Sequence, residues 1–348
     1  MVQQVIGDAE RRVLTAFAEA MPGPVLVVDL AMRLVAGNAA ARTLMPSLKT
    51  GDPLPMGVRS PEVLDAVRRV CGGGPAETTQ WVERVPVERL FEVSVAPVPL
   101  DHARAVAVAV HDLTEARRIE RMRADFIANA SHELRTPLAS LMGFIETLQG
   151  PARNDEAARL QFLGIMRDQA QRMSRLIEDL LSLSRIEQTQ HLRPQGQVDL
   201  AAVARHVADT LAPLAEETGA RVTMEAPDGA TVVGDRDEII RLAENLIENA
   251  IKYGGREGIA PEVRVEVLRG AGEIMLRVSD NGPGIAPEHI PRLTERFFRA
   301  ESSAGRARGG TGLGLAIVKH ILARHRGRLT IKSKLGEGST FSASLPDA

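Results

Sequence analysis

The sequence predicts a multidomain α+β protein with three successive parts. Its 348 residues exceed one ordinary domain, because a domain typically takes about 150 residues. Hydrophobic residues make up 44% of the chain, which is enough to build cores, and their pattern changes twice along the sequence. A mixed pattern covers residues 1–114, long helical repeats cover 115–190, and alternating helix and strand patterns cover 191–348. These three ranges are the expected domains.

The first part is expected to be a small α/β domain. Its predicted elements are helices near 11–20 and 61–70 and strands at 25–28, 91–98 and 105–110. The strands are rich in valine, and glycine and proline residues separate the elements. Helices and strands mixed over about 100 residues favour a small layered domain.

The second part has the pattern of two long helices. Apolar residues recur at alternating spacings of four and three, from Leu134 to Leu148 and again from Leu163 to Leu180. Only residues 150–155 separate the two runs, so the helices should form an antiparallel hairpin. Two helices cannot bury both sides of such seams, which favours a four-helix bundle made from two chains. A plain coiled-coil spacer is the open alternative.

The third part is expected to be a layered α/β sandwich. The predicted helices are 200–218, 235–252 and 312–324. The predicted strands are 221–225, 263–268, 274–279, 328–332 and 340–345. Alternation of this kind over about 155 residues is typical of a sheet covered by helices.

Composition excludes several classes of protein. Lysine and arginine total 43 and aspartate and glutamate 45, so a net charge of −2 gives no global attraction to nucleic acid. The single cysteine, Cys71, cannot form an intramolecular disulfide or supply a zinc ribbon or iron–sulfur cluster. The longest apolar runs fall far short of the roughly 20 residues that span a bilayer. We therefore expect no membrane span here and a cytoplasmic location, unless an anchor lies upstream.

A histidine on the first long helix is the first candidate for chemistry. His132 and Thr136 are one turn apart and lie on the face opposite the leucine seam, where a histidine is exposed. Glu133 can hold or remove a ring proton and leave the other nitrogen nucleophilic. A solvated histidine in a charged helix face is the open alternative. A zinc-binding H-E-x-x-H pair is excluded, because threonine stands at position 136.

Two glycine loops and a polar helix form the second candidate site. Asp280 follows an apolar strand and begins the loop DNGPGI, and the loop GGTGLGL opens a helix, whose N-terminus can face a phosphate. Neither a Rossmann fingerprint nor a P-loop fits these glycines, and simple turns are the alternative. On the preceding helix, Asn245 and Asn249 share one face and offer amide oxygens suited to Mg²⁺. Lys252 would add a charge for phosphates.

Five motifs together resemble a known family. They are SHELRTPL, ENLIENAIKY, DNGPGI, ERFFRAE and GGTGLGLAIVKHI. In this order and spacing the sequence is similar to bacterial two-component sensor histidine kinases of the HisKA type, and further resembles the phosphate-regulon sensor kinases. The resemblance covers residues 115–348. It implies a dimerisation and histidine-phosphotransfer hairpin followed by a GHKL (Bergerat) ATP-binding domain, shared with gyrase, Hsp90 and MutL. Residues 112–115 look like the end of a PAS domain.

The resemblance also implies a role for individual residues. His132 would be the phosphoacceptor, Glu133 its base, and Thr136 would position water in the reverse phosphatase reaction. Asn249 would hold Mg²⁺, Asp280 would accept the adenine amino group, and residues 301–309 would form a lid. The expected nucleotide-binding residues are Asn245, Asn249, Lys252, Tyr253, Asp280, Gly282, Gly284, Ile285, Phe298, Arg299, Gly310, Thr311, Gly312, Leu313 and Gly314.

The leading hypothesis is an ATP- and Mg²⁺-dependent protein-histidine kinase. It would phosphorylate itself on His132 and transfer the phosphoryl group to an aspartate of a cognate response regulator. It would also have phosphatase activity toward that regulator. The expected partners are a second copy of the chain and the regulator, without direct contact to nucleic acid. The alternatives are a non-catalytic ATP-binding scaffold and a sensor that acts mainly as a phosphatase. The intact motif positions of His132, Asn249 and Asp280 favour catalysis.

Overall fold

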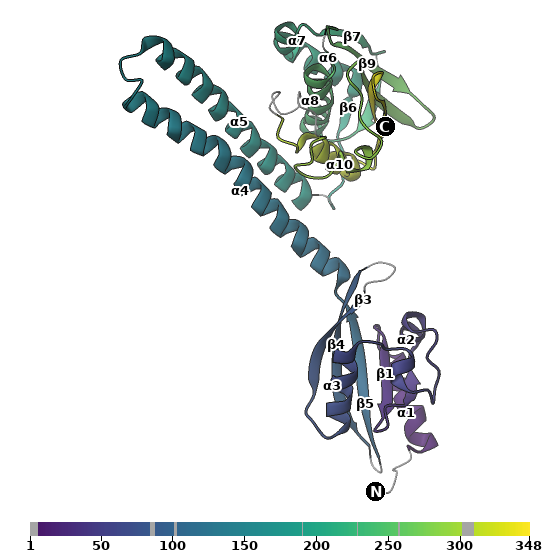
Figure 1. The fold of residues 1–348 in the computed structure, drawn as a ribbon. Coiled ribbons are helices and arrows are strands. Elements are labelled where there is room, and N and C mark those ends of the chain that lie inside the picture. Colours follow the sequence, from purple (N-terminus) through teal and green to yellow (C-terminus); the bar gives the residue numbers. More distant parts are fainter. Residues whose placement is uncertain are drawn as a thin grey trace. The chain divides into compact units, whose positions relative to one another are not determined.

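The structure is a computed structural model that describes residues 6–83, 88–100, 103–189, 191–227, 229–256, 258–300 and 310–348. These residues form two compact units, Met1–Asp125 and Phe126–Ala348 (Figure 1). Across the described residues, no helix combines the length and the apolar character that crossing a bilayer requires.

The N-terminal unit contains one five-stranded antiparallel sheet. Its strands are β1 Val25–Asp29, β2 Leu34–Gly37, β3 Glu77–Glu83, β4 Arg89–Pro99 and β5 Arg104–Asp112. They lie in the order β2-β1-β5-β4-β3. The helical elements are α1 Asp8–Glu19, α2 Ala39–Leu44, the 3₁₀ turn η1 Leu54–Met56 and α3 Pro61–Cys71. The helices and strands predicted here are confirmed. Strands β2 and β3 and helix α2 were not predicted, because they are short or polar.

The apolar run in β1 reflects burial on both faces of this sheet. Leu26 and Val28 join a core with residues of α2 and α3, whereas Val27 joins a second core with Leu14 of α1. Because successive strand side chains point to opposite faces, a strand covered on both sides is apolar throughout. Asn38 is the buried polar residue between β2 and α2, and its amide caps α2 by accepting from the Ala41 N–H at 2.9 Å.

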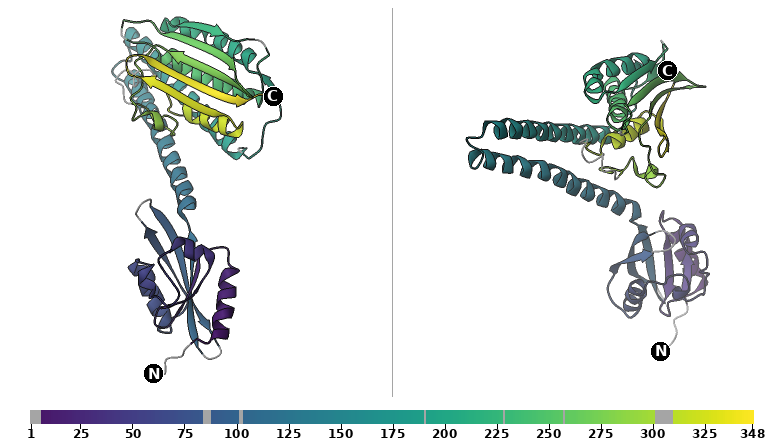
Figure 2. Two further views of the ribbon diagram at one scale, coloured as in Figure 1. Left: turned by 90° about the vertical axis from the view of Figure 1, so that its right-hand side faces the viewer. Right: turned by 45° about the horizontal axis from the view of Figure 1, so that its top comes forward.

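Two long helices follow, α4 Thr114–Gln149 and α5 Glu156–Gln188. They run side by side in opposite directions, so the antiparallel hairpin is confirmed (Figures 1 and 2). Helix α4 continues through the buried Pro137. The rings of Phe144 and Phe162 meet between the helices at 5.2 Å. Other apolar residues of the seams stay outside this contact, and Leu138 is 50% exposed.

The rest of the C-terminal unit is a two-layer sandwich. Its strands are β6 Gln197–Asp199, β7 Arg221–Glu225, β8 Thr231–Val233, β9 Glu262–Arg269, β10 Glu273–Asp280, β11 Arg328–Lys334 and β12 Gly338–Pro346. Its helical elements are α6 Leu200–Thr210, α7 Ala212–Thr218, α8 Arg236–Tyr253, the 3₁₀ turn η2 Ile290–Arg292 and α10 Gly314–Arg324. The main sheet has the order β11-β12-β10-β9-β7, with β7 and β9 parallel and the other pairs antiparallel. Strands β6 and β8 form a separate pair.

Helices α6, α8 and α10 cover one face of the main sheet (Figure 2, left). Ile247 of α8 and Leu276 of β10 are fully buried in the core between these layers. Leu183 of α5 belongs to the same core, so the hairpin and the sandwich pack as one unit. The single helix expected at 200–218 is wrong. It breaks at Leu211 because Pro213 lacks the N–H that would continue the α6 hydrogen-bonding ladder.

Candidate nucleotide and phosphoacceptor sites

A cavity of about 1000 Å³ lies beside α8 in the C-terminal unit. Its walls are α8, the loop after β10, the glycine loop before α10, and the C-terminal half of α5. The sequence-predicted residues that line it are Asn245, Asn249, Lys252, Tyr253, Asp280, Gly284, Ile285, Phe298, Arg299, Gly310, Thr311, Gly312 and Gly314. Segments separated by more than a hundred residues of sequence therefore meet at one site.

Asp280 is the last residue of β10 and is held by backbone donors. Its Oδ1 accepts from the N–H of Gly282 at 2.9 Å and from the N–H of Ser339 at 3.2 Å. Burial raises the pKa of the Asp280 carboxyl, while the two backbone bonds act in the opposite direction. Both bonds go to Oδ1. Among the described residues no bond goes to Oδ2, which can therefore accept from a donor group of a ligand. A fixed acceptor in a mostly apolar cavity suits an amino group such as that of adenine.

Two glycines are required by the backbone of the loops. Gly284 has φ +72°, and a Cβ there would collide with the carbonyl of Lys334. Gly312 has φ +73°, and a Cβ there would lie 2.9 Å from the backbone of Phe297. The N–H of Phe297 donates to the carbonyl of Gly312 at 2.9 Å, which ties the glycine loop to the residues before the predicted lid. Glycine is needed at both positions because other residues rarely adopt this conformation.

The polar residues of α8 face the cavity with defined partners. The Asn245 amide donates from Nδ2 to the carbonyl of Arg241 at 2.7 Å, which fixes the amide within its own helix. Lys252 donates to the carboxylate of Glu248 one turn earlier. Asn249 and Tyr253 also line the cavity. The helix thus places two amides, an ammonium and a phenol on one wall.

Two predicted residues and one predicted segment lie elsewhere. Leu313 is fully buried in the sandwich core rather than on the cavity wall. Gly282 is buried behind Asp280, where a Cβ would come within 2.8 Å of the Asp280 Oδ1. Both support the wall from behind. The expected lid, 301–309, lies outside the described residues.

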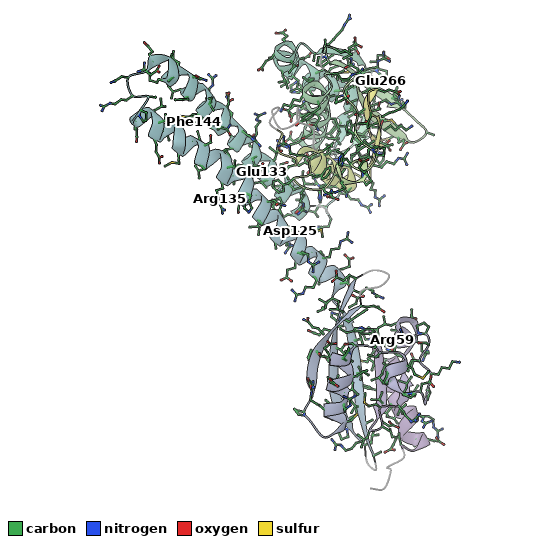
Figure 3. All side chains as sticks on the ribbon, viewed as in Figure 1. Arg59, Asp125, Glu133, Arg135, Phe144 and Glu266 are labelled. Carbon is green, nitrogen blue, oxygen red and sulfur yellow. The ribbon has the colours of Figure 1, made fainter. Side chains whose placement is uncertain are left out.

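The three residues predicted to act on the phosphoryl group lie on α4. His132 is exposed, as the helical geometry predicted. The Thr136 hydroxyl donates to the carbonyl of His132 at 3.3 Å. Glu133 lies midway along α4 and forms an ion pair with Arg172 of α5, with 3.6 Å between Oε2 and Nη2 (Figure 3). These side chains form one polar patch on the helix, and none of the three lines the cavity.

The contribution of α5 to the cavity was not predicted from the sequence. Arg172, Arg175 and Asp179 line it from the hairpin. Asp179 accepts from Nη2 of Arg241 at 2.5 Å and from the hydroxyl of Thr311 at 2.7 Å. Burial raises the pKa of the Asp179 carboxyl, which the Thr311 bond and the Arg241 charge oppose. The sequence predicted no role for these residues, because they lie on a helix whose pattern shows only a regular apolar seam.

Further along α5, a second group of contacts joins the hairpin to the sandwich. Glu187 pairs with Arg296 and lies 3.6 Å from His320 of α10. The guanidinium of Arg296 lies over the ring of Phe126, and that ring is 5.9 Å from the ring of Phe297. The segment that carries the predicted lid therefore begins directly beside both helices.

Comparison with known proteins identifies the two regions that carry these sites. Residues 122–189 match the His Kinase A (phospho-acceptor) domain, and residues 234–348 match the histidine kinase-, DNA gyrase B-, and HSP90-like ATPase family. The chain therefore carries both a histidine-kinase phosphoacceptor domain and a histidine kinase-like ATPase domain. The family resemblance found in the sequence motifs is confirmed.

The similar proteins include a sensor protein and a sensor-like histidine kinase. The chain is 40% identical over 239 residues to the phosphate regulon sensor protein PhoR of Pseudomonas aeruginosa, covering 69% of this chain and 53% of that protein. It is 37% identical over 243 residues to the sensor-like histidine kinase SenX3 of Mycobacterium tuberculosis, covering 70% of this chain and 58% of that protein. The chain thus spans little more than half the length of these relatives.

A solved structure shares the fold over nearly the whole chain. It is the histidine kinase ThkA in complex with the response regulator protein TrrA. The match covers 94% of this chain and 96% of that chain, with a TM-score of 0.51 and 19% sequence identity. This likeness supports the arrangement of helices and strands described above.

Proposed function

We propose that the protein is an ATP-dependent protein-histidine kinase that phosphorylates itself on His132. It then transfers the phosphoryl group to an aspartate of a response regulator and also dephosphorylates that regulator. One observation carries the proposal. The unit that contains the nucleotide-sized cavity, lined by the residues of the ATPase motifs, also presents an exposed histidine with a neighbouring carboxylate. In the related structure, the kinase ThkA is bound to the response regulator TrrA.

In the proposed reaction, Glu133 accepts a ring proton from His132. The freed ring nitrogen attacks the γ-phosphorus of ATP and forms a nitrogen–phosphorus bond. The bond from that phosphorus to the bridging oxygen breaks, and ADP leaves with the electron pair. In transfer, an aspartate oxygen of the regulator attacks the same phosphorus and the imidazole is released. Thr136 lies one turn from His132, where its hydroxyl can orient water against the regulator's acyl phosphate.

The cavity residues would bind the nucleotide as follows. Asp280 would accept from the adenine amino group, Tyr253 would lie near the sugar, and Lys252 would lie near the phosphates. Asn249 presents an amide oxygen on the cavity wall, which fits a hard Mg²⁺ ion that shares its other ligands with phosphates and water. When bound, Mg²⁺ would neutralise phosphate charge.

We further propose that the chain is a homodimer through the hairpin. Leu138, Leu163 and Ile177 are 50%, 49% and 44% exposed in the single chain, and a second hairpin would cover them in a four-helix bundle. Light scattering of the unmodified protein should give twice the 37.6 kDa chain mass. Leu138→Asp with Ile177→Asp should give the single mass, whereas Gln161→Asp, at an exposed polar position, should not. A single mass for the unmodified protein would contradict the bundle.

The domain limits 1–114, 115–190 and 191–348 remain our proposal. The N-terminal domain is proposed to be PAS-like and sensory, supported by its five-stranded antiparallel sheet in the order β2-β1-β5-β4-β3. We propose that the protein acts in the cytoplasm, where ATP and response regulators are found.

Labelling with γ-phosphate-labelled ATP and Mg²⁺ tests the kinase proposal. The purified protein should acquire a label that is stable in base and lost in acid, as phosphohistidine is. His132→Gln should remove the label, while His206→Gln, at another exposed histidine, should keep it. An acid-stable label, or full labelling of His132→Gln, would contradict the proposal.

The two helix-face residues should separate the two activities. Glu133→Gln should slow self-labelling about 10²–10⁴-fold, because general-base assistance typically has that value. Thr136→Ala should leave self-labelling largely intact and slow dephosphorylation of the regulator. Both activities are measured on both variants, with label gained on the kinase and label lost from the phosphorylated regulator. Equal loss of both activities in each variant would show that the substitutions disrupt the helix face as a whole.

A further inference from the structure

Asp179 is the point at which the phosphoacceptor hairpin enters the nucleotide cavity. It lies on α5 and its side chain is 16% exposed. Its two oxygens have different partners, since Oδ1 accepts from Arg241 of α8 and Oδ2 accepts from Thr311 of the glycine loop. All three residues line the cavity. One carboxylate of the hairpin therefore holds two donors that belong to the ATPase domain.

Both donors are groups that would otherwise suit a phosphate. The Thr311 hydroxyl has one proton, so it cannot donate to Asp179 and to a phosphate oxygen at the same time. The guanidinium of Arg241 is a fork that matches carboxylates and phosphates alike. Its Nε is buried without a hydrogen-bond partner among the described residues, so part of its donor capacity is unused. Thr311 also lies next to the N-terminus of α10, where an anion is favoured.

We propose that Asp179 competes with the phosphates of the bound nucleotide for Thr311 and Arg241, and so couples the hairpin to nucleotide binding. The proposal rests on the proposed function only in that the cavity binds ATP. Asp179 acts here as a positioning residue, because it works through the two donors. It lowers affinity in proportion to phosphate charge and leaves adenine recognition at Asp280 unchanged.

Linkage makes the effect reciprocal. If the contact between α5 and the glycine loop weakens ATP binding, then ATP must weaken that contact by the same factor. Nucleotide binding would thereby loosen the C-terminal half of α5 from the sandwich and free the hairpin. Nucleotide binding in the cavity would thus change the packing of the helix pair that carries His132.

Calorimetry with the full chain tests this competition. ATP, ADP and adenosine are titrated into the unmodified protein, Asp179→Asn, Asp179→Glu and Glu156→Gln. Asp179→Asn should bind ATP about fivefold more tightly and ADP about twofold more tightly, with adenosine unchanged, because only the phosphates compete. Asp179→Glu keeps the charge and should behave nearly like the unmodified protein. Glu156→Gln removes the same charge from the exposed start of α5 and should change nothing.

A double substitution separates competition from a general electrostatic effect. In Thr311→Val the hydroxyl is absent, so adding Asp179→Asn should raise ATP affinity less than it does in the unmodified background. Hydrogen exchange of the unmodified protein gives an independent readout, in which ATP should increase exchange near Asp179 and adenosine should not. This measurement decides the matter should Asp179→Asn fail to fold.

Two results would overturn the inference while leaving the kinase proposal in place. The first is unchanged or weaker ATP binding in a folded Asp179→Asn, or an equal change for all three ligands. The second is unchanged exchange near Asp179 when ATP binds. Failure of the unmodified protein to bind ATP at all would instead contradict the proposed function itself.

Discussion

The two units, each built on a five-stranded sheet, differ in where their carboxylates lie. In the N-terminal unit, Glu19 and Glu77 have lowered pKa values because each accepts a hydrogen bond from an arginine in an exposed ion pair. In the C-terminal unit, burial raises the pKa of Asp179, Glu244 and Asp280, and all three line the cavity. Burying a charged group costs free energy. Several buried carboxylates around one cavity therefore indicate a ligand-binding site.

The core of the N-terminal unit is formed by apolar packing, whereas the C-terminal unit also contains a polar cavity beside its core. Phe91 and Val93 are almost completely buried in an aliphatic cluster that closes around Trp81. In the other sheet, Leu276 and Val278 lie in the core while Asp280, at the end of the same strand, enters the cavity. Substitutions in the first group should act on folding, and substitutions at the cavity should act on binding.

The largest effect is expected from Phe91→Ala. The ring is fully buried and its centroid lies 4.8 Å from that of the tilted Trp81 ring, so its loss should reduce the free energy of unfolding of the N-terminal unit by about 3–5 kcal/mol. Denaturant unfolding followed by Trp81 fluorescence measures this change. Val82→Ala, at a half-exposed neighbouring position, is the control and should cost far less. ATP affinity in the Phe91 variant should stay the same, and a large loss of affinity would break the proposed division.

Asp280→Asn should have a smaller effect, and it should act on ATP affinity rather than on the free energy of unfolding. Loss of a charged acceptor for adenine should weaken ATP binding roughly tenfold or more, equivalent to about 1.5–3 kcal/mol. Unfolding should change little, because asparagine can still accept the N–H groups of Gly282 and Ser339. Calorimetry with ATP measures the affinity, and Asp237→Asn, on the exposed start of α8, is the matched control. Unchanged affinity in the Asp280 variant would show that the pocket is assigned wrongly.

The sequence predicted local elements better than it predicted the cavity. Strand β7 was predicted with its observed bounds, because its alternation is regular, whereas the three-residue strands β6 and β8 carry too few residues to show a period. Asp280 was found because its motif is local. Asp179 was missed because its partner Thr311 is 132 positions away, and only the folded core around Leu183 brings α5 to that loop.

The smallest expected effect is on stability in acid, where the two units should lose stability over different pH ranges. His325 is the C-cap of α10 and its side chain is fully buried. Its Nε2 accepts the N–H of Asp235 at 3.0 Å, while Nδ1 lies 2.8 Å from the Ile321 carbonyl. Nδ1 therefore carries the proton of the neutral ring. Burial lowers the pKa of His325 from 6.5, so the unfolded chain takes up a proton first as the pH falls. Protonation of this ring should therefore reduce the stability of the C-terminal unit below about pH 6.5, by at most ~1.4 kcal/mol per pH unit. The raised pKa values of Asp179, Glu244 and Asp280 act in the opposite direction, because the folded unit takes up those protons first as the pH falls further.

The N-terminal unit should respond only in more acidic solution. The pKa values of Glu19 and Glu77 are lowered from 4.5, so their contribution is present above that value and is lost as the pH falls through the folded-state values. Denaturant unfolding from pH 7.5 to 4 should thus show the C-terminal transition shifting first. His325→Gln should reduce that early shift, with His206→Gln as the control for an exposed ring. Because burial also lowers the pKa of His320, part of the shift should persist in the His325 variant. If the variant keeps the full shift, protonation of His325 does not destabilise the C-terminal unit.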